Sequence, residues 1–410
     1  MRVLLWASTL QADILALALH LDQRPGCQLL VALQGLHAYL RDPINQVRPI
    51  SSRMVERTAP DIAAVVAAFR PDIVVCDNHF PEFAAAPRVC LMWHGLGWKS
   101  CPDHDVAVRF KHVRRLTGVD PRVENPRLIA QCYHERDRAW RIDDWGMAPE
   151  NCEVVGSCFS DLLLAPPYTR EDLIRFYHVD ITARPTLLVN LTWHYGRIFP
   201  GSWKPTRFRR SPMDEDLTFF RSVLARAADH RANALVCLHD SWRYEAPFRA
   251  ALYREAGRFR HVEMKHKDEH PDNLADLLVS DAMVSNLSSF VTFFYHLGRS
   301  SVHLCPSPGR KVHFMRQTSR GPRAGSAGSG TKWMNPPEDN GGLTAFDAES
   351  ALAAIDEALT KPDCCRERAR DWLDRHIHAP DGRTARRMAD ALERQTIERG
   401  RSQRNWPRAG

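Results

Sequence analysis

The sequence contains neither a stretch that would span a membrane nor the pattern of a disulfide framework. A helix that crosses a bilayer needs roughly 18 to 20 apolar residues in succession, and the apolar residues 283–298 are interrupted by Ser, Asn and Thr. The eleven cysteines include no Cys-x-x-Cys pair, which is typical of reduced thiols in a cytosolic protein. Cys101 and His104 are zinc-ligand types, but no second pair follows them. We therefore expect no structural zinc, and a protein that is cytoplasmic or peripheral at the inner face of the cell membrane.

Several signatures of other chemistries are absent as well. The segment HGLG at residues 94–97 is similar to the oxyanion loop of α/β-hydrolases, but the chain has no G-x-S-x-G nucleophile elbow, which excludes that reading. The segment GSAGSG at residues 325–330 lacks the Lys and Ser or Thr of a Walker loop. Basic and aromatic residues are not interleaved as in RNA-binding proteins, so no nucleic-acid partner is expected.

The charge is moderately positive. A net charge of +7 favours anionic ligands or contact with an anionic membrane surface. The basic end, residues 399–408, is predicted to be a disordered tail. Its alternative interpretation is an anchor to anionic lipid.

What the chain does contain is a repeated alternation of short apolar strands and helices. Its 410 residues exceed a single typical core and predict two domains. The predicted strands are residues 3–6, 28–33, 73–76, 89–93 and 152–155, then 186–191, 234–238, 261–264, 283–284 and 301–304. Predicted helices include residues 59–69, which is the clearest, and residues 169–177, 290–297, 346–359 and 366–376. The segment 381–385 opens a last helix that runs to about residue 397. This order predicts parallel sheets with helices on both faces.

Two consecutive α/β halves with a cleft between them describe a GT-B-like fold, in which two Rossmann-like domains face each other. We place the first domain at residues 1–165 and the second at residues 166–380. The second includes a loop at residues 319–342 that is rich in Gly, Ser, Pro and Arg and is expected to be flexible. Residues 381–410 form a C-terminal helix and basic tail.

The stretch from residue 279 to residue 304 is the one around which the second half is organised. It reads as a strand, a polar turn with Asn286, Ser288 and Ser289, a helix rich in aromatic residues, and a return strand. Small hydroxyl residues at a helix start leave backbone N–H groups that can face an anion. The alternative is an ordinary helix cap in a βαβ unit.

Three histidines lie directly after predicted strands. His94 follows residues 89–93, His194 follows residues 186–191, and His239 follows residues 234–238. Ligands of parallel sheets bind beyond the carboxyl ends of the strands, so these histidines indicate a shared cleft. A histidine there can act as a general base, although a loop histidine that only holds a turn is the alternative.

Four segments resemble, in order, the motifs of one family, the CDP-glycerol glycerophosphotransferases that build teichoic-acid and related capsule polymers. Residues 93–99, WHGLGWK, are similar to the W-H-G-x-x-x-K motif of that family. Residues 237–239 resemble the strand-ending histidine of its second domain. Residues 276–295 resemble its aspartate-rich strand followed by T-D-Y-S-S and a helix. Residues 381–387, DGRTARR, resemble its D-G-x-x-[ST]-x-R segment.

Two shorter matches extend the resemblance, which covers about residues 70–395. Thr192 with Trp193 is similar to a P-T-W segment, and Gly156 with Asp161 is similar to a G-x-x-x-x-D segment. There are departures from the family pattern. Asn286 stands where the family has the aspartate of T-D-Y-S-S, residues 96–98 read LGW in place of T-P-L, and Asp240 follows His239 in place of proline.

The resemblance implies a mechanism. His94 would accept the proton of an acceptor hydroxyl, which attacks the β-phosphorus of a CDP-alcohol so that CMP leaves. His239 would stabilise the pyrophosphate, together with Ser288 and Ser289, because such transfers depend on positioning and charge neutralisation. The remaining donor-binding candidates are Asn286, Lys99, Arg243, Thr192 and His194.

The expected partners are a CDP-alcohol or other nucleotide-diphosphate donor and a polyol or glycan acceptor. The first domain would be the acceptor side and the second the donor side. We expect no cofactor, and no paired carboxylates indicate a metal. The alternative enzyme is a GT-B glycosyltransferase that uses a nucleotide sugar, with His94 again as the base. A nucleotide-sugar 2-epimerase is disfavoured, because its acidic residues have no counterpart that we can place. Because Asn286 replaces the family aspartate, a further alternative is that the protein is a non-catalytic partner in a polysaccharide assembly complex.

Overall fold

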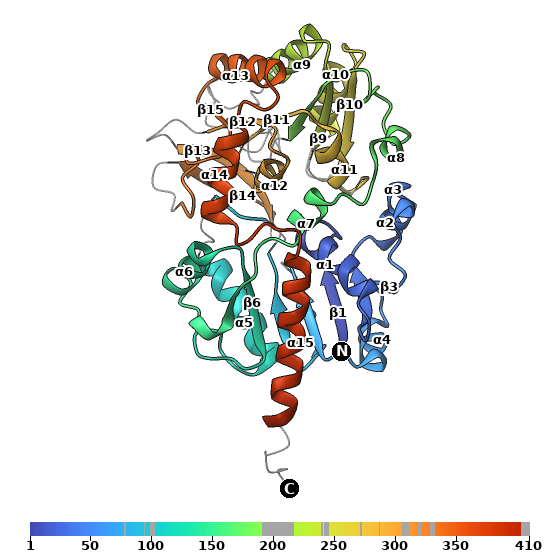
Figure 1. Ribbon diagram of the computed structural model, residues 1–410, viewed down its shortest axis with the longest axis vertical. Helices are drawn as coiled ribbons and strands as arrows, with labels where there is room; N and C mark the ends of the chain where they lie inside the picture. Colours follow the sequence, from blue (N-terminus) through green and yellow to red (C-terminus); the bar gives the residue numbers. More distant parts are fainter. Residues whose placement is uncertain are drawn as a thin grey trace.

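The computed structural model describes residues 1–77, 79–93, 95–98, 103–190, 217–238, 241, 246–270, 273–286, 288–305, 311–318, 321–328 and 333–402. They form two α/β halves stacked along the long axis of the molecule (Figure 1). Strand β1 begins at the end of the first half that is far from the second and runs toward it (Figure 1). Because all strands of this sheet are parallel, their carboxyl ends face the second half.

The first half is a seven-stranded sheet in the order β3-β2-β1-β4-β5-β6-β7. Its strands are β1 (Arg2–Ala7), β2 (Gln28–Leu33), β3 (Arg53–Glu56), β4 (Ile73–Cys76), β5 (Val89–Leu91), β6 (Leu128–Cys132) and β7 (Cys152–Val154). Its helices are α1 (Ala12–Gln23), α2 (Leu36–Arg41), α3 (Ile44–Val47), α4 (Ile62–Phe69), α5 (Asp103–Thr117), α6 (Glu135–Asp143), η1 (Pro149–Asn151) and α7 (Phe159–Leu164).

Both faces of this sheet are buried, as the alternation along β1 shows. Val3 and Leu5 pack into one apolar cluster, and Leu4 and Trp6 pack into a second one on the other face. Successive side chains of a strand point to opposite faces, so each strand of a doubly covered sheet must be apolar throughout. This requirement explains the continuous apolar runs in the sequence.

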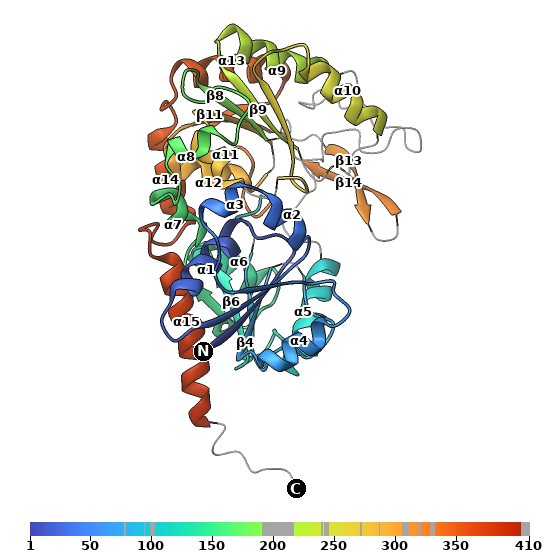
Figure 2. The ribbon, with the colours of Figure 1, turned by 90° about the vertical axis from the view of Figure 1, so that its right-hand side faces the viewer.

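The second half repeats the same topology in six strands, in the order β10-β9-β8-β11-β12-β15. The strands are β8 (Thr186–Asn190), β9 (Asn233–Leu238), β10 (Val262–His266), β11 (Ala282–Ser285), β12 (Ser300–Leu304) and β15 (Leu343–Ala345). The helices are α8 (Arg170–Ile174), α9 (Thr218–Asp229), α10 (Ala246–Ala256), α11 (Leu274–Val279), α12 (Phe290–Phe294), η4 (Tyr295–Leu297), α13 (Ala348–Thr360) and α14 (Arg366–His376). A hairpin of β13 (Lys311–Thr318) and β14 (Gly321–Gly328) projects to one side (Figure 2).

The last helix, α15 (Thr384–Ser402), leaves the second half and packs beside α1 of the first (Figure 1). Met388 and Leu392 of α15 belong to the same apolar cluster as Val3 and Leu5. The core of the first half is therefore completed by the C-terminal end of the chain.

The structure corrects several predictions. Asp276, expected on a strand, lies on helix α11, and the strand begins only at Ala282. Part of the stretch 319–342, expected as a flexible loop, is strand β14. The expected tail from residue 399 is helical as far as Ser402. The strand predicted at residues 89–93 ends at Leu91, the helix predicted at 59–69 begins at Ile62, and the helix predicted at 169–177 is limited to Arg170–Ile174. The proposed domain boundaries stay predictions.

Candidate active site

Each sheet has one point at which the strand order reverses, and ligands of such sheets bind in the crevice beyond that point. In the first half it lies between β1 and β4, and in the second between β8 and β11. Asp77 follows β4, and Asn286 follows β11. The hydroxyl of Ser285 donates to the carbonyl oxygen of Asn190 at 2.8 Å, which ties the ends of β11 and β8 together.

The edge of the first sheet carries a buried carboxylate. Asp77 accepts hydrogen bonds from the backbone N–H and the hydroxyl of Ser8, at 3.1 and 2.8 Å. Burial alone would raise the pKa of Asp77, but hydrogen bonds from His79 and Ser8 outweigh it and lower the pKa to about 2. The guanidinium of Arg57, which directly follows β3, lies 5.9 Å from the centroid of the Trp6 ring. This edge therefore presents one fixed negative and one positive charge.

The loop after β5 connects this edge to the second half. Gly95 has φ +129°, and a Cβ there would lie 2.9 Å from Oγ and 3.0 Å from Cβ of Ser289. Only glycine fits both the backbone conformation and this close approach. Phe293 of α12 lies on the same side, with its Cζ 3.3 Å from that position. The glycine after His94 is thus in contact with the serine turn that the sequence singled out.

Trp98 fixes the far end of this loop to the second half. Its side chain is 2% exposed, and its Nε1 donates to the carbonyl oxygen of Ser288 at 3.2 Å. Its ring lies 5.6 Å from that of His303 and 5.9 Å from that of Trp372. Because a buried indole with a satisfied N–H anchors well, residues 95–98 are held by the second half of the molecule.

The backbone of the same loop is paired as well. The carbonyl oxygen of Trp98 accepts from the N–H groups of Met334 and Asn335 at 3.0 and 3.1 Å. The side-chain amide of Asn335 donates to the carbonyl oxygen of Gly97 at 2.9 Å. Two crevices beside the loop, of about 30 and 20 Å³, are lined by Leu96, Trp140 and Met334 among others. Each has room for only about one water. This side of the loop is therefore packed, and a ligand would approach from another side.

Ser288 and Ser289 open helix α12. The Ser288 hydroxyl accepts from the N–H of Phe290 at 3.3 Å, which is a local turn contact. Ser289 occupies the N-cap position of α12, and its side chain makes no capping hydrogen bond. Asn286 is 2% exposed and the two serines are half-buried. The anion-binding interpretation of this turn stays a prediction, and so does its alternative as an ordinary helix cap.

Six of the predicted site residues lie outside the described residues. They are His94, Lys99, Thr192, His194, His239 and Arg243. Their roles stay predictions. The structure does bring Gly95, the residue after His94, into contact with the turn that contains Ser288 and Ser289. The two segments are almost two hundred residues apart in the sequence.

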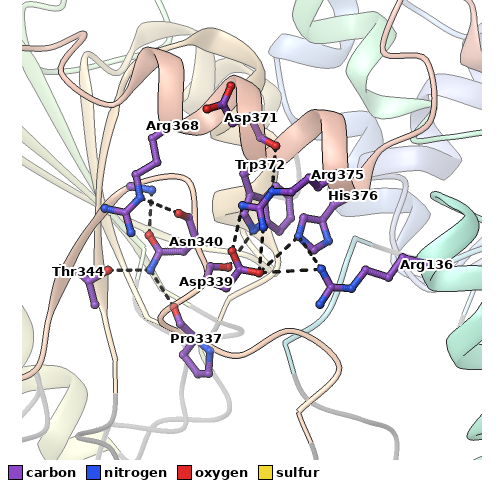
Figure 3. A network of polar contacts seen from close by, with 11 residues as sticks. Arg136, Pro337, Asp339, Asn340, Thr344, Arg368, Asp371, Trp372, Arg375 and His376 are labelled. Atoms are coloured by element: carbon purple, nitrogen blue, oxygen red, sulfur yellow. Dashed lines mark hydrogen bonds and ion pairs between the residues drawn. The ribbon is translucent and has the colours of Figure 1, made fainter.

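A network of polar groups crosses between the halves beside the loop (Figure 3). Asp339 accepts from Arg375 of α14 at 3.0 Å and lies 3.9 Å from Arg136 of α6. The guanidinium of Arg136 lies 3.5 Å from Nε2 of His376. Burial, and then the charge of Arg136, lower the pKa of His376 to about 4. The imidazole is therefore neutral at pH 7 and can accept from Arg136.

Two of the family-like segments have a structural role instead. Asp161 accepts from the N–H groups of Thr384 and Ala385, at 3.0 and 2.7 Å, and so caps helix α15. Arg387 pairs with Asp381 at 2.7 Å and donates to the carbonyl oxygen of Val155. The segments G-x-x-x-x-D and D-G-x-x-[ST]-x-R thus form one joint, which ties α15 to the first half.

A larger cavity lies elsewhere. It has a volume of about 280 Å³ and is lined by Arg184, Pro185, Asp281 and Pro362 among others. Arg184 and Pro185 precede β8, Asp281 precedes β11, and the carbonyl oxygen of Pro362 accepts from the N–H of Ser300 at the start of β12. The cavity therefore lies at the amino ends of these strands, whereas ligands of parallel sheets bind at the carboxyl ends. Within the described part of the chain, no three His, Cys, Asp or Glu side chains gather as metal ligands. No helix in that part combines the length and apolar composition of a membrane-spanning segment.

No family model and no curated protein matches the sequence. Solved structures match at the level of the fold. The wall teichoic acid polymerase TagF aligns with a TM-score of 0.63 at 12% identity, over 97% of this chain and 89% of that one. A histidine-to-asparagine variant of TagF with CDPG aligns with a TM-score of 0.64 at 12% identity, over 97% and 90%.

An epimerase shares the fold too. The UDP-GlcNAc 2-epimerase from Neisseria meningitidis, bound to UDP-GlcNAc, aligns with a TM-score of 0.56 at 12% identity, over 96% of this chain and 100% of that one. The chain has the fold of these enzymes. The GT-B-like fold of two Rossmann-like halves is confirmed, and so, at the level of the fold, is the resemblance to the teichoic-acid polymerases.

Proposed function

We propose that the protein is a transferase that moves an alcohol phosphate, such as glycerophosphate, from a CDP-activated donor to an acceptor hydroxyl. One observation carries this proposal: the glycine that follows His94 packs on Ser289, so a family-like segment of each half meets at the edge where parallel sheets bind ligands. The acceptor would be a polyol or glycan of a cell-surface polymer, reached at the inner face of the cell membrane.

The proposed reaction is a displacement at phosphorus. The acceptor oxygen forms a bond to the β-phosphorus of the CDP-alcohol, and the bond from that phosphorus to the bridging oxygen breaks. CMP leaves with the bonding electrons, and His94 takes the hydroxyl proton. His239 and the hydroxyls of Ser288 and Ser289 would neutralise the charge that develops on the phosphate oxygens.

The other donor-side candidates fit around this reaction. Lys99 and Arg243 would supply positive charge to the pyrophosphate, while Asn286, Thr192 and His194 would bind the donor by hydrogen bonds. Asn286 follows β11 at the strand reversal of the second sheet, which supports its assignment to the donor side. The TagF structure with CDPG supports a nucleotide-linked donor for this fold.

A nucleotide sugar is the second candidate donor. The observation that favours it is the similar fold of an epimerase bound to UDP-GlcNAc. His94 would again act as the base, with attack at a sugar carbon. Both candidates place a nucleotide diphosphate against the second half.

Ligand-dependent thermal stabilisation separates the candidates, because a ligand that binds only the folded state raises its apparent stability. The panel is CDP-glycerol, CDP-ribitol, CMP, UDP-sugars and GDP-sugars. We expect stabilisation by the CDP-alcohols and CMP. Stabilisation by UDP- or GDP-sugars alone would contradict this proposal and favour a glycosyltransferase that uses a nucleotide sugar. No stabilisation by any of them would favour a non-catalytic assembly partner.

Turnover of CDP-glycerol to CMP is then measured in variants. A general base contributes about 10² to 10⁴-fold to a rate, so His94→Ala should lower turnover by at least 100-fold on that estimate. His230→Ala is the matched control, because His230 pairs with Asp356 on the far side of the second half. Equal activity of the two variants would contradict the role of His94.

A further inference from the structure

A buried chain of hydrogen bonds ends on the backbone beside His94. The N–H of Gly95 donates to the hydroxyl oxygen of Tyr133 at 2.9 Å, and that hydroxyl donates to Oδ2 of Asp13 at 2.6 Å. Asp13 is 0% exposed and Tyr133 is 1% exposed. We propose that Tyr133 and Asp13 are positioning residues, which hold the amide of Gly95 and through it the loop that carries His94. The catalytic consequence rests on the proposed function.

Which group donates and which accepts in these hydrogen bonds follows from the chemistry of the groups. Burial raises the pKa of Asp13 to about 6, against the lowering effect of hydrogen bonds from Tyr133, Phe159 and Ser157. The N–H of Gly95 can only donate a hydrogen bond, and a carboxylate can only accept. The single hydroxyl proton of Tyr133 must then point to Asp13, which leaves the phenol oxygen as an acceptor for Gly95.

The carboxylate is itself fixed. Its Oδ1 accepts from the Ser157 hydroxyl at 2.8 Å and from the N–H of Phe159 at 2.9 Å. Burial and the nearby charge of Asp13 raise the pKa of Tyr133 well above its ordinary value, so the phenol keeps its proton. Asp13 lies in the first turn of α1, and Tyr133 directly follows β6. Groups that are locked on rigid elements place a neighbouring backbone precisely enough for catalysis.

Gly95 is in contact both with Tyr133 of the first half and with the second half. Its amide is held by the first half, while Ser289 of the second half covers its α-carbon. Trp98 anchors the other end of the loop on Ser288. Loss of the Tyr133 hydroxyl would release only the end of the loop next to His94. The expected result is a loss of turnover without a comparable loss of nucleotide binding.

The test is Tyr133→Phe, which removes one oxygen and keeps the ring. The matched control is Tyr177→Phe, because Tyr177 is also buried and also donates to a buried carboxylate, Oδ1 of Asp276, at 2.7 Å. We would measure kcat and KM for CDP-glycerol, the affinity for CMP, and amide hydrogen exchange in peptides that contain Gly95.

We expect Tyr133→Phe to lower kcat at least tenfold, to change the CMP affinity less than twofold and to speed amide hydrogen exchange at Gly95. Tyr177→Phe should change none of the three. Equal losses of kcat in both variants, or unchanged exchange at Gly95 in Tyr133→Phe, would overturn it. If Tyr133→Phe does not fold, the same measurements are made on Asp13→Asn, which removes one of the two carboxylate oxygens that accept hydrogen bonds. They then decide whether the positioning role holds.

The two proposals can fail separately. If the wild-type protein does not consume CDP-glycerol, the proposed function fails. Hydrogen exchange still decides the positioning role, which stands only if Gly95 loses protection in Tyr133→Phe and keeps it in Tyr177→Phe.

Discussion

Two of the contacts between the halves, among the residues that the structure describes, are built alike but differ in what surrounds them. The loop joint is residues 95–98 against Ser288, Ser289, Met334 and Asn335. The helix joint is Gly156 and Asp161 against residues 378–387. Each contains a glycine with positive φ pressed against another segment, and each is made of family-like motifs.

The joints differ in what their polar groups contact. In the helix joint, Asp161 and Arg387 bond to backbone groups and to Asp381, so the joint consists of structural contacts. The loop joint places the residue after His94 on the serine turn, beside the edge where ligands bind. A segment that resembles a family motif can therefore make contacts within the fold or lie beside the edge where parallel sheets bind ligands, and only the contacts distinguish the two cases.

The largest expected effect is on the helix joint. A Cβ at Gly156 would lie 2.5 Å from the carbonyl oxygen of His378, with φ +94°. Left-handed strain and overpacking against a backbone atom predict that Gly156→Ala loses on the order of 3–5 kcal/mol of unfolding free energy. Gly382→Ala is the control, because Gly382 has φ +75° but no heavy atom within 4 Å of its Cβ position. Equal losses in denaturant titrations would contradict the close-approach argument.

The corresponding change in the loop joint should affect activity more than stability. In Gly95→Ala the new Cβ meets the side chain of Ser289, which can move, so we expect a loss of about 2 kcal/mol. Turnover of CDP-glycerol should fall at least tenfold, because the loop is displaced. The double variant Gly95→Ala with Ser289→Gly removes the contact but keeps the φ strain. Because Ser289 is itself a candidate phosphate-binding residue, the double variant is compared with Ser289→Gly alone. Equal turnover of these two variants supports the steric explanation, and lower turnover of the double variant assigns the loss to strain.

Trp98→Phe tests the anchor of the loop joint. It removes the hydrogen bond from Nε1 to Ser288 and leaves a buried acceptor, at a cost of about 1–2 kcal/mol. Trp145→Phe is the matched control, since the buried Nε1 of Trp145 has no hydrogen-bond partner among the described residues. Thermal denaturation should separate the two variants, and a larger loss in Trp145→Phe would show that ring volume dominates.

Asp161→Asn tests the cap in the helix joint. An amide keeps one acceptor oxygen for the two N–H groups of Thr384 and Ala385, so the expected loss is about 1 kcal/mol. Turnover at a temperature where both proteins are folded should stay at the wild-type value. A selective loss of turnover would place the helix joint in the chemistry and remove the distinction between the joints.

The smallest effect is expected for the ion pairs beside the loop joint. The side chain of Arg136 is 49% exposed and lies 3.9 Å from Asp339, and exposed pairs contribute about 0–1 kcal/mol. Arg136→Gln should therefore change the unfolding free energy by less than about 1 kcal/mol. Any difference should shrink at high salt, where exposed charges are screened. A larger or salt-independent loss would show that Arg136 has a buried role.

The sequence by itself determined most of the secondary structure of the two sheets. The strands at residues 28–33 and 73–76 and the helix at residues 366–376 were predicted with their observed bounds, because buried strands require apolar runs and amphipathic helices require a 3.6-residue period. It missed β3 and β15, which are four and three residues long at the edges of their sheets. It also missed β13 of the hairpin and β6, a five-residue strand inside the first sheet. Short edge strands carry little of that pattern.

The sequence also placed the HGLG and serine segments after strands, since the carboxyl ends of parallel strands share one edge. It could not show that Gly95 touches Ser289, or that Trp98 enters the second half. It gave no signal for Asp13 and Tyr133, which are 120 residues apart and lie on elements of ordinary pattern. Such contacts depend on how the helices and sheets pack, so only the tertiary structure decided which residues support the loop of His94.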